Sequence, residues 1–173
     1  MRASGYPIAV LTLLLDGLKG VASVWLARWL APGMPGLAII APIFAIIGHN
    51  YSVFLAEKDT TGKLIFKGGA GGATTLGASL ALLPSAFPIV IAIAMLMFFA
   101  VGYASLATLS IGVSTLLTSI IRYLLGLSSW HYIAFGVLST GLLVLALLPN
   151  INRLINGTER GVSWRLKKPG NFI

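Results

Sequence analysis

Residues 68–121 read GGAGGATTLGASLALLPSAFPIVIAIAMLMFFAVGYASLATLSIGVSTLLTSII and contain no Asp, Glu, Lys or Arg. Another uncharged run extends from Tyr123 to Asn152. A helix of about 18 or more apolar residues is long enough to cross a bilayer. Over the whole chain 57% of the residues are hydrophobic and only 9% are charged, whereas soluble domains carry about 25% charged residues. The sequence therefore predicts a polytopic membrane protein.

The charges of this basic chain collect at the ends of the apolar runs. The formal net charge is +8, and most charged residues lie within 57–67 and 153–168. Such positions are typical of positive-inside signals and of contacts with lipid headgroups. Because no basic stripe is interleaved with aromatic residues, a nucleic-acid partner is not expected. Cysteine is absent, which excludes disulfides and thiol chemistry.

Glycines and prolines divide the chain into six expected helices. They cover about 7–30, 37–55, a short helix ending at 83, 86–100, one ending near 125, and 130–148. The short helix cannot cross ~30 Å of hydrocarbon unless protein or water shields one end. An even number of spans places both termini and the polar segment 56–72 on one side, and their Lys and Arg residues identify that side as the cytoplasm. The expected fold is one all-α, multi-pass helix bundle over residues 1–173.

Glycines also gather where the short helix begins. Lys67 is followed by Gly68-Gly69-Ala70-Gly71-Gly72. Glycines let backbone N–H groups converge, a helix N-terminus carries about half a positive charge and lysine adds a full one, so a phosphate group suits this stretch. The stretch is not a Walker A sequence, since the lysine precedes the glycines. Small residues also permit close helix packing, and from the residues alone both interpretations stay open.

The two histidines differ in their surroundings. His49 lies in Gly48-His49-Asn50-Tyr51, near the cytoplasmic end of the second expected helix. It could act as a general base, donate to phosphate or organise a pocket. It could also be a packing residue, although polar groups at membrane depth usually have a function. His131 follows Trp130 at a helix start and is expected to be interfacial.

Polar residues occur at two further places along the helices. Asp16 and Lys19 lie three residues apart on one helical face and predict an ion pair that lowers the cost of both charges in lipid, or else a support for a site. Asn150, Arg153 and Glu159 end the last helix, where they could bind a polar headgroup or cap the helix and reach the interface.

Two separated histidines and four acids give no metal-ligand spacing, so neither a metal nor another cofactor is expected. No Gly-x-Ser-x-Gly or Ser/His/Asp arrangement supports a nucleophile.

Taken together, four pieces of sequence occur in the order seen in the PlsY family, and the chain resembles that family over nearly its whole length. The pieces are Leu15-Asp16-Gly17-Leu18-Lys19-Gly20, Gly48-His49-Asn50-Tyr51-Ser52-Val53-Phe54, Lys67-Gly68-Gly69-Ala70-Gly71, and Asn150-Ile151-Asn152-Arg153-Leu154 with Gly157-Thr158-Glu159. The resemblance implies a bundle of seven helices with three cytoplasmic motif regions. It also implies an enzyme of the bacterial inner membrane that transfers an acyl group from acyl phosphate to glycerol 3-phosphate and forms lysophosphatidic acid for phospholipid biosynthesis.

The resemblance further implies roles for individual residues. Two phosphate groups are held by backbone amides and cations, and catalysis rests on proximity and electrostatic stabilisation rather than on a side-chain nucleophile. The expected partners are the two substrates and membrane lipid, with the site on the cytoplasmic face. The implied phosphate-binding residues are Arg2, Lys67, Gly68, Gly69, Gly71 and Asn150, the pocket organisers are His49 and Asn150, and the supporting residues are Asp16, Lys19, Arg153 and Glu159.

The chain departs from the family pattern at several positions. The first motif, Gly-Ser-Gly-Asn-x-Gly-Ala-Thr-Asn, is missing ahead of Arg2, so we expect the chain to begin inside that motif. Ala70 replaces the second lysine of Phe-Lys-Gly-Gly-Lys-Gly, and Leu147 stands where a histidine is usual. Nine extra residues, 57–65, precede Phe66. Two other functions therefore stay open: a catalytically impaired relative that binds lipid or an assembly partner, and a small transporter, which only the short helix before Pro84 supports.

Overall fold

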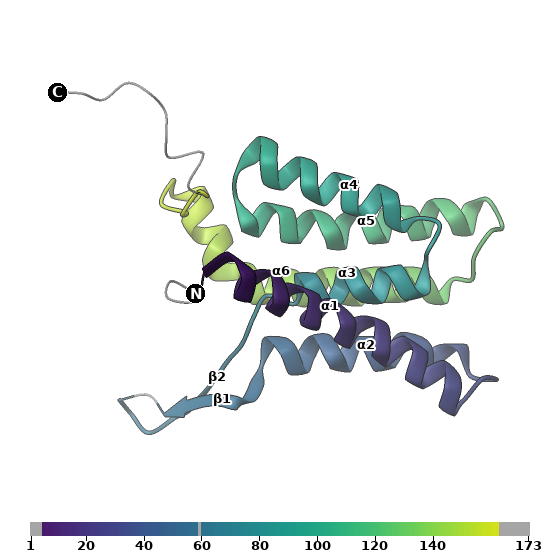
Figure 1. The fold of residues 1–173 in the computed structure, drawn as a ribbon, viewed down its shortest axis with the longest axis horizontal. Helices are drawn as coiled ribbons and strands as arrows, with labels where there is room; N and C mark the ends of the chain where they lie inside the picture. The colour runs from purple at the N-terminus through teal and green to yellow at the C-terminus, as the bar shows by residue number, and fades with distance from the viewer. Residues whose placement is uncertain (1–4, 59, 163–173) are drawn as a thin grey trace.

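The first apolar run forms one long helix, α1 (Gly5–Leu30), which ends where Pro32 and Gly33 interrupt it. The computed structural model describes residues 5–58 and 60–162. Within these residues α1 is followed by five more helices and one β-hairpin (Figure 1). The bundle of six helices expected from the apolar runs is confirmed. The remaining helices are α2 (Pro35–Asn50), α3 (Gly72–Leu82), α4 (Phe87–Leu96), α5 (Ala104–Leu124) and α6 (His131–Ile155).

The second helix was expected to reach residue 55, and this boundary is wrong. The helix ends at Asn50, and the chain then forms β1 (Ser52–Lys58), which pairs antiparallel with β2 (Leu64–Lys67). The residues of β1 include Val53 and Phe54, whose branched and aromatic side chains suit a strand better than a helix end. The hairpin projects beyond the bundle (Figure 1), and Phe54 at 99% is almost fully exposed. The extra residues 57–65 therefore belong to this hairpin.

The short helix α3 lies at the centre of the bundle, where it packs against α1, α2, α4, α5 and α6. Eight of its residues are buried, among them Thr74, Thr75 and Ser79. The Ser79 hydroxyl lies 2.9 Å from that of Thr115 in α5. Surrounding protein shields α3, as its short length requires in a membrane.

The last helix was expected to end at residue 148, and this too is wrong. The helix continues through Pro149 to Ile155. It is terminated by Gly157, two residues beyond its last residue, whose φ of +68° is the left-handed conformation that glycine adopts readily. There the Thr158 N–H donates to the Arg153 carbonyl and the Gly157 N–H donates to that of Leu154. This pattern is a Schellman motif, which satisfies carbonyls at a helix end.

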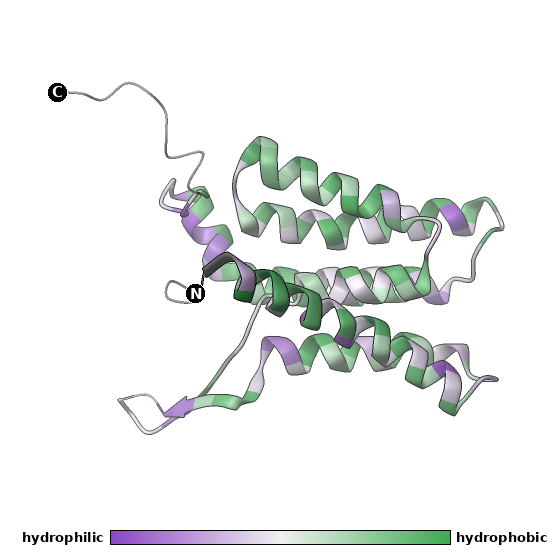
Figure 2. Cartoon of the chain, viewed as in Figure 1, coloured by the Kyte–Doolittle hydropathy of each residue, from purple (hydrophilic) through white to green (hydrophobic). Residues whose placement is uncertain are grey.

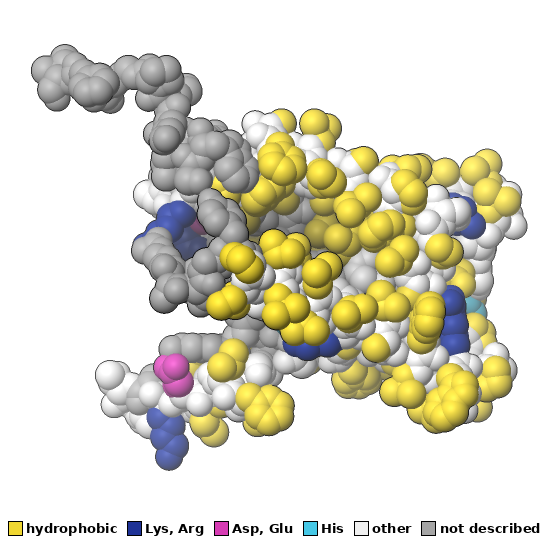
Figure 3. All heavy atoms as spheres, viewed as in Figure 1, with side chains coloured by type: hydrophobic (Ala, Val, Ile, Leu, Met, Phe, Trp, Pro, Cys, Tyr) yellow, Lys and Arg dark blue, Asp and Glu magenta, His cyan; other side chains and the backbone are white. Residues whose placement is uncertain are grey.

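The outer surfaces of the helices are apolar, as a bilayer requires. Figure 2 shows hydrophobic residues along the helices and hydrophilic ones at the hairpin and near the end of α6. In Figure 3 hydrophobic side chains cover most of the visible face. Three helices, α1, α5 and α6, are long and apolar enough to cross a membrane, while α2, α3 and the unit of α4 with the π-helical turn η1 (Met97–Val101) are shorter. The start of α1, the hairpin and the end of α6 lie at the same end of the bundle (Figure 1).

Candidate active site

The glycine-rich stretch forms a loop that lies against the end of α2. The Gly69 N–H donates to the His49 carbonyl at 3.1 Å. A Cβ atom at Gly68 would overlap the carbonyl groups of His49 and Asn50, and one at Gly69 would overlap the His49 imidazole. Gly71 adopts a φ of +76° at the N-cap of α3. The loop therefore needs glycine both for close approach and for its backbone conformation.

The His49 ring lies between this loop and the first helix. Its Nδ1 atom lies 3.5 Å from Oδ1 of Asp16, and its Nε2 atom is the side-chain atom that a Cβ at Gly69 would meet first. The same Asp16 oxygen accepts a hydrogen bond of 2.8 Å from Lys19. The expected Asp16–Lys19 ion pair is thus present, and it extends to His49. Asp16 thus lies beside one edge of the imidazole ring, and the loop lies beside the other edge.

A cavity of about 290 Å³ opens on the other side of the loop. The glycine loop, the start of α5 and the last third of α6 form its walls. Its polar groups include the Ser105 hydroxyl and the Asn150 amide, which come from elements far apart in the sequence. The lining residues are Gly68, Gly69, Ala70, Ala104, Ser105, Thr108, Ala146, Leu147 and Asn150. The cavity thus joins two of the sequence motifs, the glycine stretch and the Asn150 region.

Glu159 organises the polar side of this cavity. Its Oε1 atom accepts hydrogen bonds from Asn150 at 2.9 Å and from Ser105 at 3.2 Å, and its Oε2 atom accepts one from Arg153 at 2.9 Å. The carboxylate is only 7% exposed. Burial raises its pKa, but the hydrogen bonds from Asn150, Arg153 and Ser105 and the charge of Arg153 together lower the pKa below its ordinary value. Glu159 therefore stays ionised near neutral pH and holds two cavity residues in place.

We expect the stabilising effect of Glu159 to depend on pH in the acid range only. Because its pKa is lowered by folding, its contribution is present above the ordinary value of 4.5 and is lost as the pH falls through the lower value of the folded protein. Thermal unfolding of the protein and of Glu159→Gln should therefore differ most near neutral pH and converge in acid. A difference that stayed constant from neutral pH to strong acid would contradict the assignment.

The described residues place most of the predicted site residues around this loop and cavity. Arg2 lies outside the described residues, and so does the side chain of Lys67, the last residue of β2. The loop separates the remaining polar site residues into two groups. The group on the side of α1 and α2 is Asp16, Lys19 and His49. The group across the cavity from the loop is Asn150, Arg153 and Glu159. His131 stacks on Trp130 at the opposite end of the bundle, with ring centroids 4.3 Å apart.

Three residues with a place at the site were not singled out in the sequence. Asn50 is 5% exposed, its Oδ1 atom has no hydrogen-bond partner among the described residues, and a Cβ atom at Gly71 would lie 2.5 Å from that oxygen. The sequence did contain a signal for Asn50, because it directly follows His49. Two adjacent polar residues at the end of a membrane helix are costly and usually have a function. Ser105 and Thr108 line the cavity from α5. Serine and threonine are common in membrane helices, so their residue type alone carried no signal.

The fold and the site together define an integral membrane protein with a small polar cavity beside a glycine loop at a helix start. The family model described as glycerol-3-phosphate acyltransferase matches residues 1–157. A glycerol-3-phosphate acyltransferase of Syntrophomonas wolfei is 33% identical over 162 residues, which cover 94% of this chain and 75% of that protein. One of Rubrobacter xylanophilus is 36% identical over 165 residues, covering 95% of this chain and 76% of the relative.

Solved structures agree with the sequence matches. A crystal structure of PlsY (YgiH), described as an integral membrane glycerol 3-phosphate acyltransferase in its glycerol 3-phosphate form, superposes with a TM-score of 0.78 at 27% identity, over 96% of this chain and 78% of that one. Its lysophosphatidic acid form gives a TM-score of 0.77. The chain therefore belongs to the glycerol-3-phosphate acyltransferase family, the PlsY family of the sequence resemblance. It is an acyltransferase of phospholipid biosynthesis.

Proposed function

We propose that this protein transfers an acyl group from acyl phosphate to the 1-hydroxyl of glycerol 3-phosphate. The observation that carries the proposal is the cavity between the glycine loop and Asn150, because its lining offers groups that can bind phosphate. The family supports it, since its solved member is described with glycerol 3-phosphate and with lysophosphatidic acid. The cavity suits a small polar acceptor, and the surrounding bilayer suits a donor with a long acyl chain. On this proposal residues 1–173 act as one domain.

The phosphate groups would be bound mainly by backbone amides. The first N–H groups of a helix have no partner within that helix, and those of α3 follow directly on the glycine loop. The positive end of the helix dipole favours an anion there. Ser105 and Asn150 line the same cavity, and Glu159 accepts a hydrogen bond from both, which restrains the two side chains. Lys67 and Arg2 are the cations that we propose complete the charge balance.

The reaction needs no covalent enzyme intermediate. The glycerol hydroxyl oxygen attacks the carbonyl carbon of acyl phosphate, the new ester C–O bond forms, and the bond from that carbon to the phosphate oxygen breaks. The hydroxyl proton leaves with the released phosphate, and the product is lysophosphatidic acid. Two substrates held side by side gain from proximity, and the amides stabilise the charge that develops on oxygen. Ala70 and Leu147 lie in the cavity wall where the family has basic residues, so this cavity holds fewer cations.

The site would face the cytoplasm. The hairpin and the end of α6 with the segment that follows it carry Lys58, Lys63, Arg153 and Arg160, and they lie at the end of the bundle where the glycine loop leads into α3 (Figure 1). The opposite end carries Arg28 and Arg122 among the described residues. An excess of lysine and arginine is typical of the cytoplasmic side of bacterial membrane proteins. We propose the inner membrane as the location of this multi-pass protein.

The donor assay tests this function. Purified protein in lipid nanodiscs is given labelled glycerol 3-phosphate with either an acyl phosphate or an acyl thioester of the same chain length. We expect lysophosphatidic acid from the acyl phosphate only, and we expect Asn150→Ala to reduce its formation by about tenfold or more because a cavity hydrogen bond is lost. Asn156→Ala, at the exposed end of α6, is the control and should keep full activity. Equal use of the thioester would contradict the donor, and absence of product with every donor would contradict the function.

A further inference from the structure

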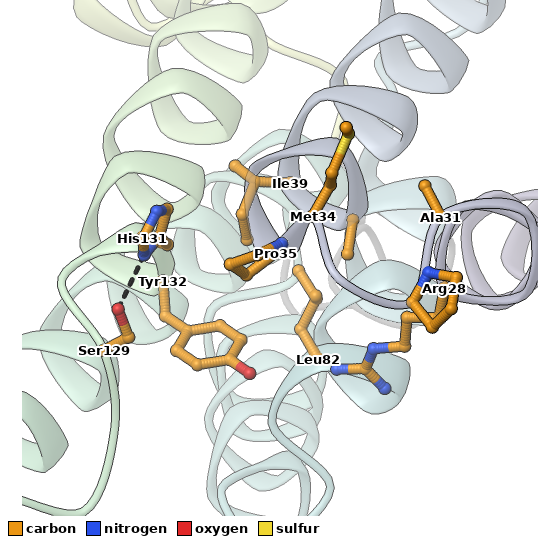
Figure 4. A pocket seen from close by; sticks show the side chains of 11 residues that line it. Arg28, Ala31, Met34, Pro35, Ile39, Leu82, Ser129, His131 and Tyr132 are labelled. Carbon is orange, nitrogen blue, oxygen red and sulfur yellow. Dashed lines mark hydrogen bonds between the residues drawn. The ribbon is translucent and has the colours of Figure 1, made fainter.

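A second cavity lies at the end of the bundle opposite the glycine loop. It measures about 320 Å³ and is formed by the turn between α1 and α2, the end of α3 and the start of α6. Figure 4 shows the Arg28 side chain and the Tyr132 ring approaching Leu82 from opposite sides. Met34, Pro35 and Ile39 supply apolar walls. The cavity is thus apolar for most of its depth with a few polar groups at its edge.

Arg28 is the charged group of this cavity. Its Nη1 atom donates to the Ala81 carbonyl at 3.0 Å, which holds the guanidinium at the end of α3. Arginine has five N–H donors, so this contact leaves most of them available for an acceptor. Ser129 and His131, also in the lining, bond each other at 2.6 Å. Among the described residues that line the cavity there is no Asp or Glu, so an anion would meet no repulsion there.

Aromatic residues place this end of the bundle at a membrane surface. Trp25, Trp29 and Trp130 are 65%, 78% and 58% exposed, and all three lie near the turns that form the cavity. Tryptophan is enriched at the level of the lipid headgroups, because one part of its ring system is apolar and the N–H is polar. Arg28 is close to Trp29 in sequence and therefore lies at the same depth. The cavity consequently opens where phosphate groups of lipids are found.

We propose that this cavity binds the headgroup phosphate of an anionic phospholipid of the opposite leaflet. The phosphate pairs with the Arg28 guanidinium, a planar fork of donors that matches phosphate oxygens. The Tyr132 hydroxyl, which points toward the guanidinium in Figure 4, lies within the same lining. The first part of an acyl chain then packs on Met34, Pro35 and Ile39. A free phosphate ion could use the same arginine, but it would leave the apolar walls uncovered.

Lipid retention measures this binding. The protein is taken up in phosphatidylcholine nanodiscs with or without a minor fraction of phosphatidylglycerol, released into mild detergent, and examined by native mass spectrometry for bound lipid. We expect phosphatidylglycerol to be retained in preference to phosphatidylcholine, and Arg28→Gln to lower that retention about tenfold, as loss of a charge-assisted hydrogen bond does. Tyr132→Phe should lower it less. Arg122→Gln is the matched control, since it removes one positive charge at the same end outside the cavity lining.

The outcomes separate the possible occupants. Retention that is equal in Arg28→Gln and Arg122→Gln would overturn the site. Competition by inorganic phosphate at low concentration, without preference for the lipid, would assign the cavity to a free anion and overturn the lipid proposal. Should Arg28→Gln fail to fold, Arg28→Lys keeps the charge and the contact with α3 while removing the planar fork, and a lowered retention in that variant supports the proposal. Acyl transfer at the other end of the bundle is measured in parallel and should stay unchanged in all four variants.

Discussion

Replacement of Gly69 by alanine is expected to abolish acyl transfer while the helix bundle stays folded. The new Cβ atom would overlap Nε2, Cε1 and Cδ2 of His49, so it meets the Nε2 edge of the ring. The ring cannot move away easily, because its other nitrogen lies 3.5 Å from Asp16 and its backbone carbonyl accepts from the loop. The loop must shift instead. Misplacement of a binding group by about 1 Å can cost on the order of 100-fold in rate.

The matched control for Gly69 is Gly48, which immediately precedes His49 in α2. A Cβ atom at Gly48 meets no atom within 4 Å, so Gly48→Ala should keep both the fold and the activity. Thermal unfolding and the rate of lysophosphatidic acid formation are measured for both variants. Near-normal activity of Gly69→Ala would show that the loop position does not matter for transfer. Equal loss in both variants would point to a general effect on α2 and would also contradict the expectation.

Sequence patterns predicted the helices more reliably than their ends. Apolar runs located all six helices, because burial in lipid requires such runs whatever the packing. The ends depended on interactions that no local pattern reveals. The Gly69 N–H of the glycine loop occupies the His49 carbonyl, and Gly68 lies close against the carbonyls of His49 and Asn50, where α2 ends. Pro149 predicted a stop, but the Schellman motif at Gly157 determines the end of α6.

The parts of the site that carry unusual residues were predicted, and the parts built from common ones were not. A histidine and an acid within apolar helices are costly, so both stood out in the sequence. The glycines stood out because they cluster beside a lysine. The structure brings His49, Gly69 and Asp16 together and sets Asn150 across the cavity from the loop. Ser105 was missed because its role depends on Glu159, which is distant in sequence. The roles of all these residues in phosphate binding and catalysis stay predictions until the variants are measured.

Replacement of Gly77 by alanine is expected to destabilise the whole bundle. A Cβ atom at Gly77 would overlap the carbonyl group and Cα of Gly17, and one at Gly20 would overlap the carbonyl of Thr74, so α1 and α3 cross with their backbones in contact. Backbone atoms cannot rotate away, and the two helices must separate. Elsewhere α1 packs mainly on α2, so its contact with α3 is a large part of what positions it. Forced overpacking of this kind costs about 3 kcal/mol.

The same helix pair supplies a graded test of this close crossing. A Cβ atom at Gly17 would meet the Ala73 carbonyl at 3.7 Å, an ordinary contact, so Gly17→Ala should leave the free energy of unfolding nearly unchanged. Gly141 in α6 meets nothing within 4 Å, and its replacement by alanine should stabilise that helix by up to about 1 kcal/mol. Unfolding by titration with a denaturing detergent should therefore rank Gly77→Ala and Gly20→Ala far below the other two variants. If all four unfolded at the same detergent fraction, backbone contact between α1 and α3 would not be what holds the first helix against the bundle, and its packing on α2 would have to keep α1 in position.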